Sequence, residues 1–224
     1  MVEPTSMKPL ILAGGKSTRM GSPKHLLKLP NGKPLYRHQM DVLRAVLPGS
    51  KVHISLAQES PLDETLQSAR KYSEESKAPS GPEDGELEVI FDYNVNDSAE
   101  SKGPAEGLLS AHSACPDATW LVVACDHPYV TSATLRYLIG SYSPPVTCFR
   151  NSEGFCEPLL GIWSPAALER LAENVARGKS GPAATVREIK GAMLSVPEGC
   201  EAWLVDVNRQ ADWEAALEKL AASI

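Results

Sequence analysis

The chain has 224 residues, of which 42% are hydrophobic and 22% are charged, and its formal net charge is −6 at pH 7. This composition is typical of an ordinary globular domain, and the acidic balance argues against a general nucleic-acid binder. No apolar run approaches the roughly 20 residues that a membrane span needs, so we expect neither nucleic acid nor a membrane as a partner.

The amino-terminal residues and the cysteines bear on where the protein works. Residues 1–7 lack the apolar core and the small-residue cleavage site of a secretory signal. The five cysteines are scattered and form no C-x-x-C pair. We therefore expect reduced thiols in a cytoplasmic protein, and no zinc site.

Strand-like and helix-like segments alternate along the chain. The predicted strands cover residues 8–13, 51–56, 87–91, 120–125, 146–150, 159–163 and 204–207. The predicted helices begin near residues 35 and 104 and cover residues 61–72, 131–141, 165–177, 182–190 and 211–222. Residues 73–86 are rich in Ser, Glu, Gly and Pro and lack apolar periodicity, which indicates a mobile surface insertion.

Repeated strand–helix units predict an α/β fold, a single domain over residues 1–224 with a mainly parallel sheet and helices on both faces. In such sheets, ligands bind beyond the carboxyl ends of the strands. Each of the motifs described next follows a predicted strand or precedes a predicted helix at such an end.

The first strand leads into a glycine-rich loop that also carries cations. Gly14 and Gly15 are adjacent, Gly21 follows, and Arg19 and Lys24 supply positive charge. Glycines allow backbone N–H groups to approach anionic oxygens closely, and the cations neutralise them. The spacing matches neither the P-loop nor the G-x-G-x-x-G fingerprint. A bland strand–loop–helix connection is the alternative, but the combination favours a nucleotide.

Asp126 follows the apolar run of residues 120–125 and stands two residues before Pro128. A carboxylate at the tip of a buried strand points into the crevice where the opening loop also lies. Mg²⁺ takes one or two carboxylates plus phosphate oxygens, so Asp126 is a candidate magnesium ligand. The alternative role is a cap for the helix that begins near Thr131.

Two further motifs leave more than one interpretation open. Gly103-Pro104 begins a predicted helix, where glycine either permits close approach to a base or ribose or simply precedes a helix start. Asn208 is either a second metal or pyrophosphate contact or a helix cap. We interpret His112 and His127 as structural side chains, or as side chains that support residues of the site, and not as general bases.

These motifs together resemble the MobA-like nucleotidyltransferases, the molybdenum cofactor guanylyltransferase group. The shared patterns are Leu-Ala-Gly-Gly, Arg-Met-Gly and Lys in the opening loop, Gly-Pro-x-x-Gly at residues 103–107, Cys-Asp-x-Pro at residues 125–128 and the asparagine at position 208. The resemblance implies a three-layer α/β/α, Rossmann-like domain of the nucleotide-diphospho-sugar transferase type. Departures occur at residues 21–24, which lean toward the cytidylyltransferases, and at Asp206, where the family has asparagine.

The resemblance also implies roles for individual residues. Arg19, Lys24 and Asp126 would be catalytic, and Asp126 and Asn208 would hold Mg²⁺. The nucleotide would contact Leu12, Ala13, Gly14, Gly15, Arg19, Lys24, Asp92, Gly103, Pro104 and Asp126. The expected reaction is attack by a phosphate of an acceptor, molybdopterin by family, on the α-phosphorus of a nucleoside triphosphate, with GTP favoured.

Three alternatives remain at this stage. The donor and acceptor could be those of a cytidylyltransferase or of a sugar-phosphate nucleotidyltransferase on the same fold. The chain could also be a non-catalytic nucleotide-binding subunit. We expect a monomer or a weak homo-oligomer.

Overall fold

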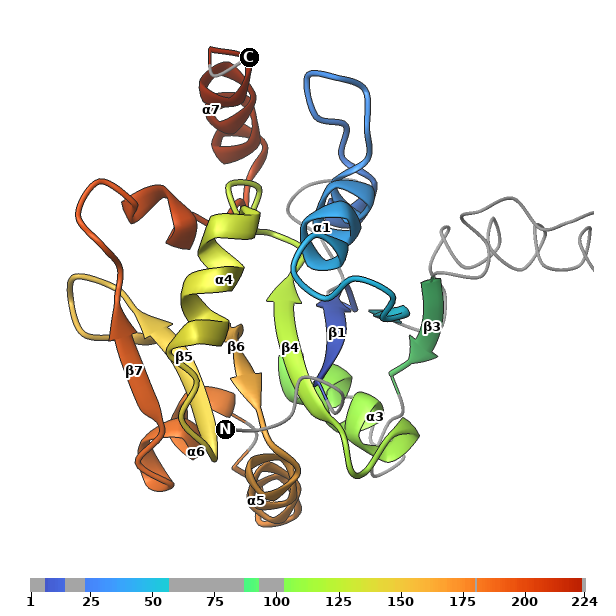
Figure 1. Cartoon of the computed structure of the whole chain (residues 1–224), viewed down its shortest axis with the longest axis vertical. Coiled ribbons are helices and arrows are strands. Elements are labelled where there is room, and N and C mark those ends of the chain that lie inside the picture. Colours follow the sequence, from blue (N-terminus) through green and yellow to red (C-terminus); the bar gives the residue numbers. More distant parts are fainter. Residues whose placement is uncertain (1–6, 15–22, 57–86, 93–102, 180, 223–224) are drawn as a thin grey trace, which may run out of the picture.

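The computed structural model describes residues 7–14, 23–56, 87–92, 103–179 and 181–222. The described strands form one seven-stranded sheet with the order β3-β2-β1-β4-β6-β5-β7 (Figure 1). The strands are β1 (Met7–Leu12), β2 (Val52–Leu56), β3 (Leu87–Phe91), β4 (Thr119–Ala124), β5 (Val146–Arg150), β6 (Cys156–Trp163) and β7 (Ala192–Ser195). The α-helices are α1 (Leu35–Arg44), α3 (Pro104–Ala114), α4 (Ser132–Gly140), α5 (Pro165–Ala176), α6 (Pro182–Glu188) and α7 (Gln210–Ala221).

The sheet is mainly parallel, as the sequence predicts. The pairs β3·β2, β2·β1, β1·β4 and β5·β7 are parallel. Strand β6 runs antiparallel to both of its neighbours, β4 and β5, and its arrow points against that of β4 in Figure 1. This reversal brings the amino-terminal end of β6 to the edge where the parallel strands β1 and β4 end.

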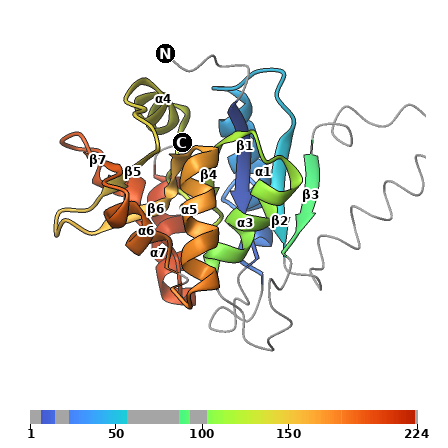
Figure 2. The same cartoon turned by 90° about the horizontal axis from the view of Figure 1, so that it is seen from below.

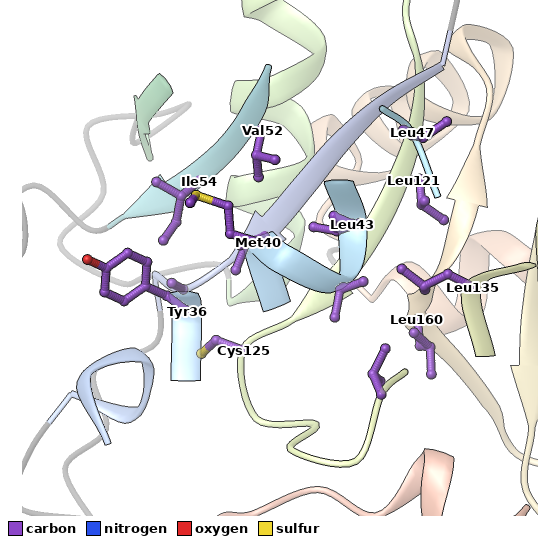
Figure 3. Packing of buried hydrophobic residues seen from close by; sticks show 14 of the residues in the cluster. Tyr36, Met40, Leu43, Leu47, Val52, Ile54, Leu121, Cys125, Leu135 and Leu160 are labelled. Atoms are coloured by element: carbon purple, nitrogen blue, oxygen red, sulfur yellow. The ribbon is translucent and has the colours of Figure 1, made fainter. Parts of the chain in front are cut away.

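Two hydrophobic cores lie on opposite faces of the sheet. Helices α1 and α4 cover one face, and helices α3, α5 and α6 cover the other (Figures 1 and 2). In the first core, Met40 and Leu43 of α1 lie among Ile54 of β2, Leu121 of β4 and Leu135 of α4 (Figure 3). Strand β4 is buried at every residue, which explains why its sequence is continuously apolar rather than alternating.

A third, smaller core ties the carboxyl-terminal helix to the segment before α1. Leu29 and Leu35 pack with Val207, Trp213 and Ala216. Leu27, which directly follows the 3₁₀ turn η2 (Lys24–Leu26), packs against the same core. This packing places α7 beside the segment between η2 and α1.

One predicted strand is wrong, and one strand of the structure was not predicted. Residues 204–207 form no strand: the 3₁₀ turn η3 (Glu201–Leu204) precedes an extended segment in which the Val207 amide donates to the carbonyl oxygen of Asp126 at 2.9 Å. The strand that completes the sheet is β7, four residues with an alternating exposure too short to stand out in the sequence. The predicted helix 61–72 and the insertion 73–86 lie outside the described residues.

Within the described ranges, none of the helices has both the length and the apolar character needed to cross a membrane. All five cysteines are free thiols. Burial raises the pKa of Cys125 to about 12, so this thiol stays protonated and contributes as a packing side chain.

Candidate active site

The ends of the parallel strands are held together by hydrogen bonds that continue beyond the strands themselves. The Ala13 amide donates to the Ser55 carbonyl, the Asp92 amide to the Leu56 carbonyl and the Cys125 amide to the Leu12 carbonyl, each at 2.9 Å. The residues that follow β1, β3 and β4 therefore lie along one edge of the sheet. This is the carboxyl edge, where α/β folds bind their ligands.

At the centre of this edge, Lys24 joins Asp126 to Asn208. Its Nζ atom lies 3.1 Å from Oδ2 of Asp126 and 2.6 Å from Oδ1 of Asn208. The Lys24 side chain is 14% exposed and that of Asp126 is 25% exposed. Asp126 lies 102 positions and Asn208 lies 184 positions after Lys24 in the sequence, and the fold brings the three into one polar cluster.

The segment that carries Asn208 is fixed from both sides. Val207 is buried, and its amide bonds to the Asp126 carbonyl. The Asp212 carboxylate accepts from the amides of Asn208, at 3.1 Å, and Arg209, at 2.8 Å. Asn208 also donates through Nδ2 to Asp206 at 2.6 Å, so its Oδ1 atom is turned toward Lys24.

The capping roles considered from the sequence belong to other residues. Thr131 begins α4 and accepts from the Thr134 amide at 3.3 Å, so that helix does not need Asp126. The exposed amides before α7 are satisfied by Asp212 rather than by the Asn208 side chain. Asp126 and Asn208 are thus left to face the site.

Asp92 lies at the far end of the edge, beyond β2. It accepts a short hydrogen bond from the Ser55 hydroxyl. Its pKa is raised above the usual carboxyl range, mainly by burial and also by the neighbouring Glu106, and the Ser55 bond offsets part of that effect. Gly107 of α3 packs directly behind this pair: a Cβ atom there would lie 2.5 Å from Ser55 Oγ and 2.8 Å from Leu12 Cδ2.

The two glycines of the motif at the start of α3 have different functions. Gly103 has φ +68° and ψ −149°, a conformation open to glycine, and it is followed by Pro104 in the first turn of the helix. Because Gly107 has no side chain, the backbone of α3 packs closely against Ser55, Leu12 and Asp92. Leu12, Ala13 and Gly14 lie at the end of β1, and Gly15 and Arg19 lie outside the described residues.

The histidines near the site fit structural roles. His127 is 4% exposed, and its Nε2 atom lies 3.9 Å from Oδ1 of Asp126. Its Nδ1 atom is buried and has no hydrogen-bond partner in the part of the chain that the structure describes.

Gln39 of α1, 1% exposed, donates to the Ala124 carbonyl at 3.0 Å and so holds the end of β4 in place.

Glu157 is a residue of this edge that sequence reasoning missed. It is the second residue of β6 and is half-buried. Burial raises the pKa of its carboxyl group, His127 lowers it, and the charges of Asp206 and Asp126 raise it further. The sequence held no signal for it, because only the antiparallel direction of β6 brings the start of this strand to the carboxyl edge.

The oxygens of Asp126 and Asn208 suit a magnesium ion. An ammonium group already lies between them, which shows that a cation fits at this point. Hard oxygen ligands are those that Mg²⁺ prefers, and a phosphate-bound Mg²⁺ needs one or two of them from the protein. Among the described residues, no group of three or more His, Cys, Asp and Glu side chains is placed to hold a metal ion.

Comparisons with known proteins agree with this geometry. The model of the MobA-like NTP transferase domain matches residues 9–192. The chain is 31% identical over 215 residues to a protein of Synechococcus elongatus named probable molybdenum cofactor guanylyltransferase, covering 92% of this chain and 95% of that one. It is also 31% identical to a molybdenum cofactor biosynthesis bifunctional protein of Synechocystis, of which it spans 42%.

A solved structure has the same fold. Molybdopterin-guanine dinucleotide biosynthesis protein A from Archaeoglobus fulgidus superposes with a TM-score of 0.66 at 19% identity, over 96% of this chain and all of that one. At that identity, the likeness concerns the fold. The family model extends from β1 to the start of β7, and it therefore includes the opening loop, Asp126 and Glu157. The chain is a nucleotidyltransferase that belongs to the MobA-like NTP transferase family.

Proposed function

We propose that this nucleotidyltransferase transfers GMP from GTP to molybdopterin and releases pyrophosphate. The observation that carries the proposal is the convergence of Lys24, Asp126 and Asn208 at the end of β4. The names of the relatives support the choice of donor and acceptor. The nucleoside would lie over β1, β2 and β3, between Gly14 and the Ser55–Asp92 pair.

The reaction requires the two substrates to be positioned correctly and the negative charge of the triphosphate to be neutralised. A phosphate oxygen of the acceptor forms a bond to the α-phosphorus of GTP, and the bond from that phosphorus to the bridging oxygen breaks, leaving pyrophosphate. The nucleophile is already an anion, so no general base is required. When bound through Asp126 and Asn208, Mg²⁺ would neutralise charge on the triphosphate.

Lys24 would contribute by moving a short distance. In the structure its ammonium group forms an ion pair with Asp126. When a magnesium–nucleotide complex arrives, the flexible lysine stem lets Nζ turn from the carboxylate to the phosphate oxygens. Arg19 of the opening loop would supply a second cation for the same phosphates, and Gly14 and Gly15 would let backbone amides approach them.

Replacing Asp126 with alanine tests the metal half of the proposal. We expect the Asp126→Ala enzyme to lose at least about 100-fold in turnover, because a missing charge partner of the transition state costs several kcal/mol. Pyrophosphate release measures this loss. The matched control is Asp117→Asn, an exposed aspartate at the opposite end of β4, which should keep wild-type turnover. Near-normal pyrophosphate release by Asp126→Ala would overturn the proposal.

The choice of base is tested by a panel of GTP, CTP, ATP and UTP with Mg²⁺ in thermal unfolding. A ligand at 100 times its dissociation constant stabilises the folded state by about 2.7 kcal/mol, so the true donor raises the melting temperature most. We expect GTP to give the largest shift. The largest shift with CTP would instead assign the chain to cytidylyl transfer.

A further inference from the structure

The described edge of the sheet divides into a nucleotide side and an acceptor side. Asp92 and Gly14 follow β3 and β1, and Ser55 is the fourth residue of β2. All three lie on one side of β4, and this is the side proposed for the nucleoside. Asp126 marks the middle, at the tip of β4. Strands β6 and β5 lie on the other side. Because the α-phosphorus must lie near the metal, the acceptor has to approach over β6 and β5.

Glu157 lies at the start of this acceptor side. Strand β6 begins at Cys156 and runs antiparallel to β4, so Glu157 lies at the carboxyl edge of the sheet, where β4 leads into Asp126. The β4·β6 pairing ends at Val123 and Leu160, and an irregularity of β6 lies between Leu160 and Glu157. The charges of Asp126, Asp206 and His127 all act on the Glu157 carboxylate. That carboxylate makes no hydrogen bond or ion pair with any side chain in the part of the chain that the structure describes.

A half-buried carboxylate without such partners is unfavourable for folding by itself. The negative charges of Asp126 and Asp206 act on it, so a phosphate group is not a suitable partner for it. The groups that satisfy a carboxylate in such surroundings are N–H or O–H donors. In a reaction between two phosphate esters, those donors belong to the part of the acceptor that carries no phosphate.

Phe155 adds an aromatic surface beside Glu157. Its carbonyl oxygen accepts from the Asn151 amide at 2.9 Å, and Glu157 pairs with Phe149 in the same hairpin. Phe155 immediately precedes β6, and its hydrogen bond with Asn151 continues the β5–β6 pairing by one residue. Successive residues of an extended segment alternate between faces, so Phe155 and Glu157 share a face of the hairpin. Phe155 is 61% exposed, the most exposed large hydrophobic side chain in the described chain. An aromatic ring in this position offers a flat apolar face to a ligand.

We propose that Glu157 and Phe155 recognise the ring of the acceptor: the carboxylate accepts hydrogen bonds from N–H groups of a flat heterocycle, and the phenyl ring packs against its face. A pterin has this chemistry, since it is planar and carries several N–H donors. The inference rests on the proposed function for the location of the acceptor. It extends that function by assigning acceptor specificity to the β5–β6 hairpin.

The experiment separates acceptor binding from donor binding. Steady-state GMP transfer to molybdopterin gives KM for the acceptor and kcat, and calorimetric titration with Mg²⁺ and a non-hydrolysable GTP analogue gives the donor affinity. For Glu157→Gln we expect the acceptor KM to rise about tenfold or more, since the side chain loses its negative charge and one of its two acceptor oxygens. For Phe155→Ala we expect a rise of about threefold to tenfold. Glu157→Asp should lie between Glu157→Gln and the wild type.

Donor affinity should stay at the wild-type value in all three variants. The matched control is Glu153→Gln, an exposed acid at the tip of the same hairpin, which should leave both constants unchanged. An unchanged acceptor KM in Glu157→Gln overturns the inference. A loss of Mg²⁺-dependent GTP-analogue binding in Glu157→Gln also overturns it, because that result would make Glu157 part of the metal site.

Failure of the proposed function gives a different result. If the wild type binds Mg²⁺ and the GTP analogue but transfers no GMP to molybdopterin, the acceptor assigned under the proposed function is wrong. Binding of a pterin to the β5–β6 hairpin is then tested by ligand-observed NMR with pterin-6-carboxylate as the probe. Saturation transfer to the probe that disappears in the Glu157→Gln/Phe155→Ala double variant supports the inference. No transfer in the wild type, or equal transfer in both proteins, overturns it.

Discussion

The positions of Ser55 and Asp92 depend on how closely the backbone of α3 approaches the sheet. Ser55 and Asp92 form a hydrogen-bonded pair at the ends of β2 and β3, and Gly107 lies directly behind them. Because Asp92 is held half-buried with a raised pKa, its position depends on the Ser55 hydroxyl and on the space that Gly107 leaves. The close contact explains why a glycine occurs inside a helix, where it is otherwise unfavourable.

We expect Gly107→Ala to lower the free energy of unfolding by about 1–3 kcal/mol, because an added methyl group would overpack against Ser55 and Leu12. The same change should displace Asp92 and weaken binding of the GTP analogue. Urea unfolding and calorimetric titration measure the two effects. The control is Gly140→Ala, at the end of α4, where a Cβ atom meets no heavy atom within 4 Å. Equal stability of the two variants would contradict this account of Gly107.

At the scale of elements, the connection from η3 to α7 carries the second oxygen of the proposed metal site. It is an extended segment without ladder partners, held by the Val207 amide on Asp126 and by the amides that Asp212 accepts. Trp213, 4% exposed, packs α7 against Leu29 and Leu35. The helix thus positions Asn208 by packing, and Asp212 fixes the turn that precedes it.

Replacing Asp212 with alanine should destabilise the protein by about 1 kcal/mol, the usual effect of losing a helix cap. It should also weaken Mg²⁺-dependent nucleotide binding, because the Asn208 backbone loses its hydrogen bond. Thermal unfolding and titration with Mg²⁺ and the GTP analogue test both effects. Glu214→Gln, an exposed change one position beyond the first turn of α7, is the control. Wild-type nucleotide binding by Asp212→Ala would show that this turn does not position Asn208.

For the molecule as a whole, pH should affect stability through buried histidines. His25, in η2 next to Lys24, is 3% exposed, and burial lowers its pKa to about 4 from 6.5. Burial also lowers the pKa of His38 and of His53. An unfolded chain takes up protons on these rings as the pH falls below 6.5, while the folded chain resists protonation. The folded state therefore loses stability between pH 6.5 and pH 4.

The contribution of His25 to this loss should reach about 3 kcal/mol, since each unit of pKa shift corresponds to 1.36 kcal/mol. We expect the free energy of unfolding of His25→Gln to fall less steeply than that of the wild type over this range. Urea unfolding at several pH values between 7 and 4 measures the slopes, with an unchanged m-value as the control for compactness. Parallel slopes would show that His25 is protonated in the folded state.

The sequence by itself determined the features that depend on neighbours in the chain. The continuous apolar run of β4 predicted a strand buried on both faces, and Asp126 at its end followed from that. The glycine-rich loop and the Cys-Asp-x-Pro pattern indicated the reaction type, because phosphate binding needs particular residue types at short, fixed spacings. The helix cap of α5 is also a local feature: Ser164 accepts from the amide of Ala167, three residues further along the chain.

Tertiary structure alone decided which distant residues meet. Lys24 contacts Asn208 across 184 positions, and the packing of α7 on Leu29 and Leu35 makes this possible. The direction of β6 brought Glu157 to the site, and residues 204–207 became an extended connection while β7 filled the sheet edge. Local patterns record burial and backbone preference over a few residues. Strand direction and long-range contacts depend instead on how all the apolar faces are buried at once, and no short segment contains that information.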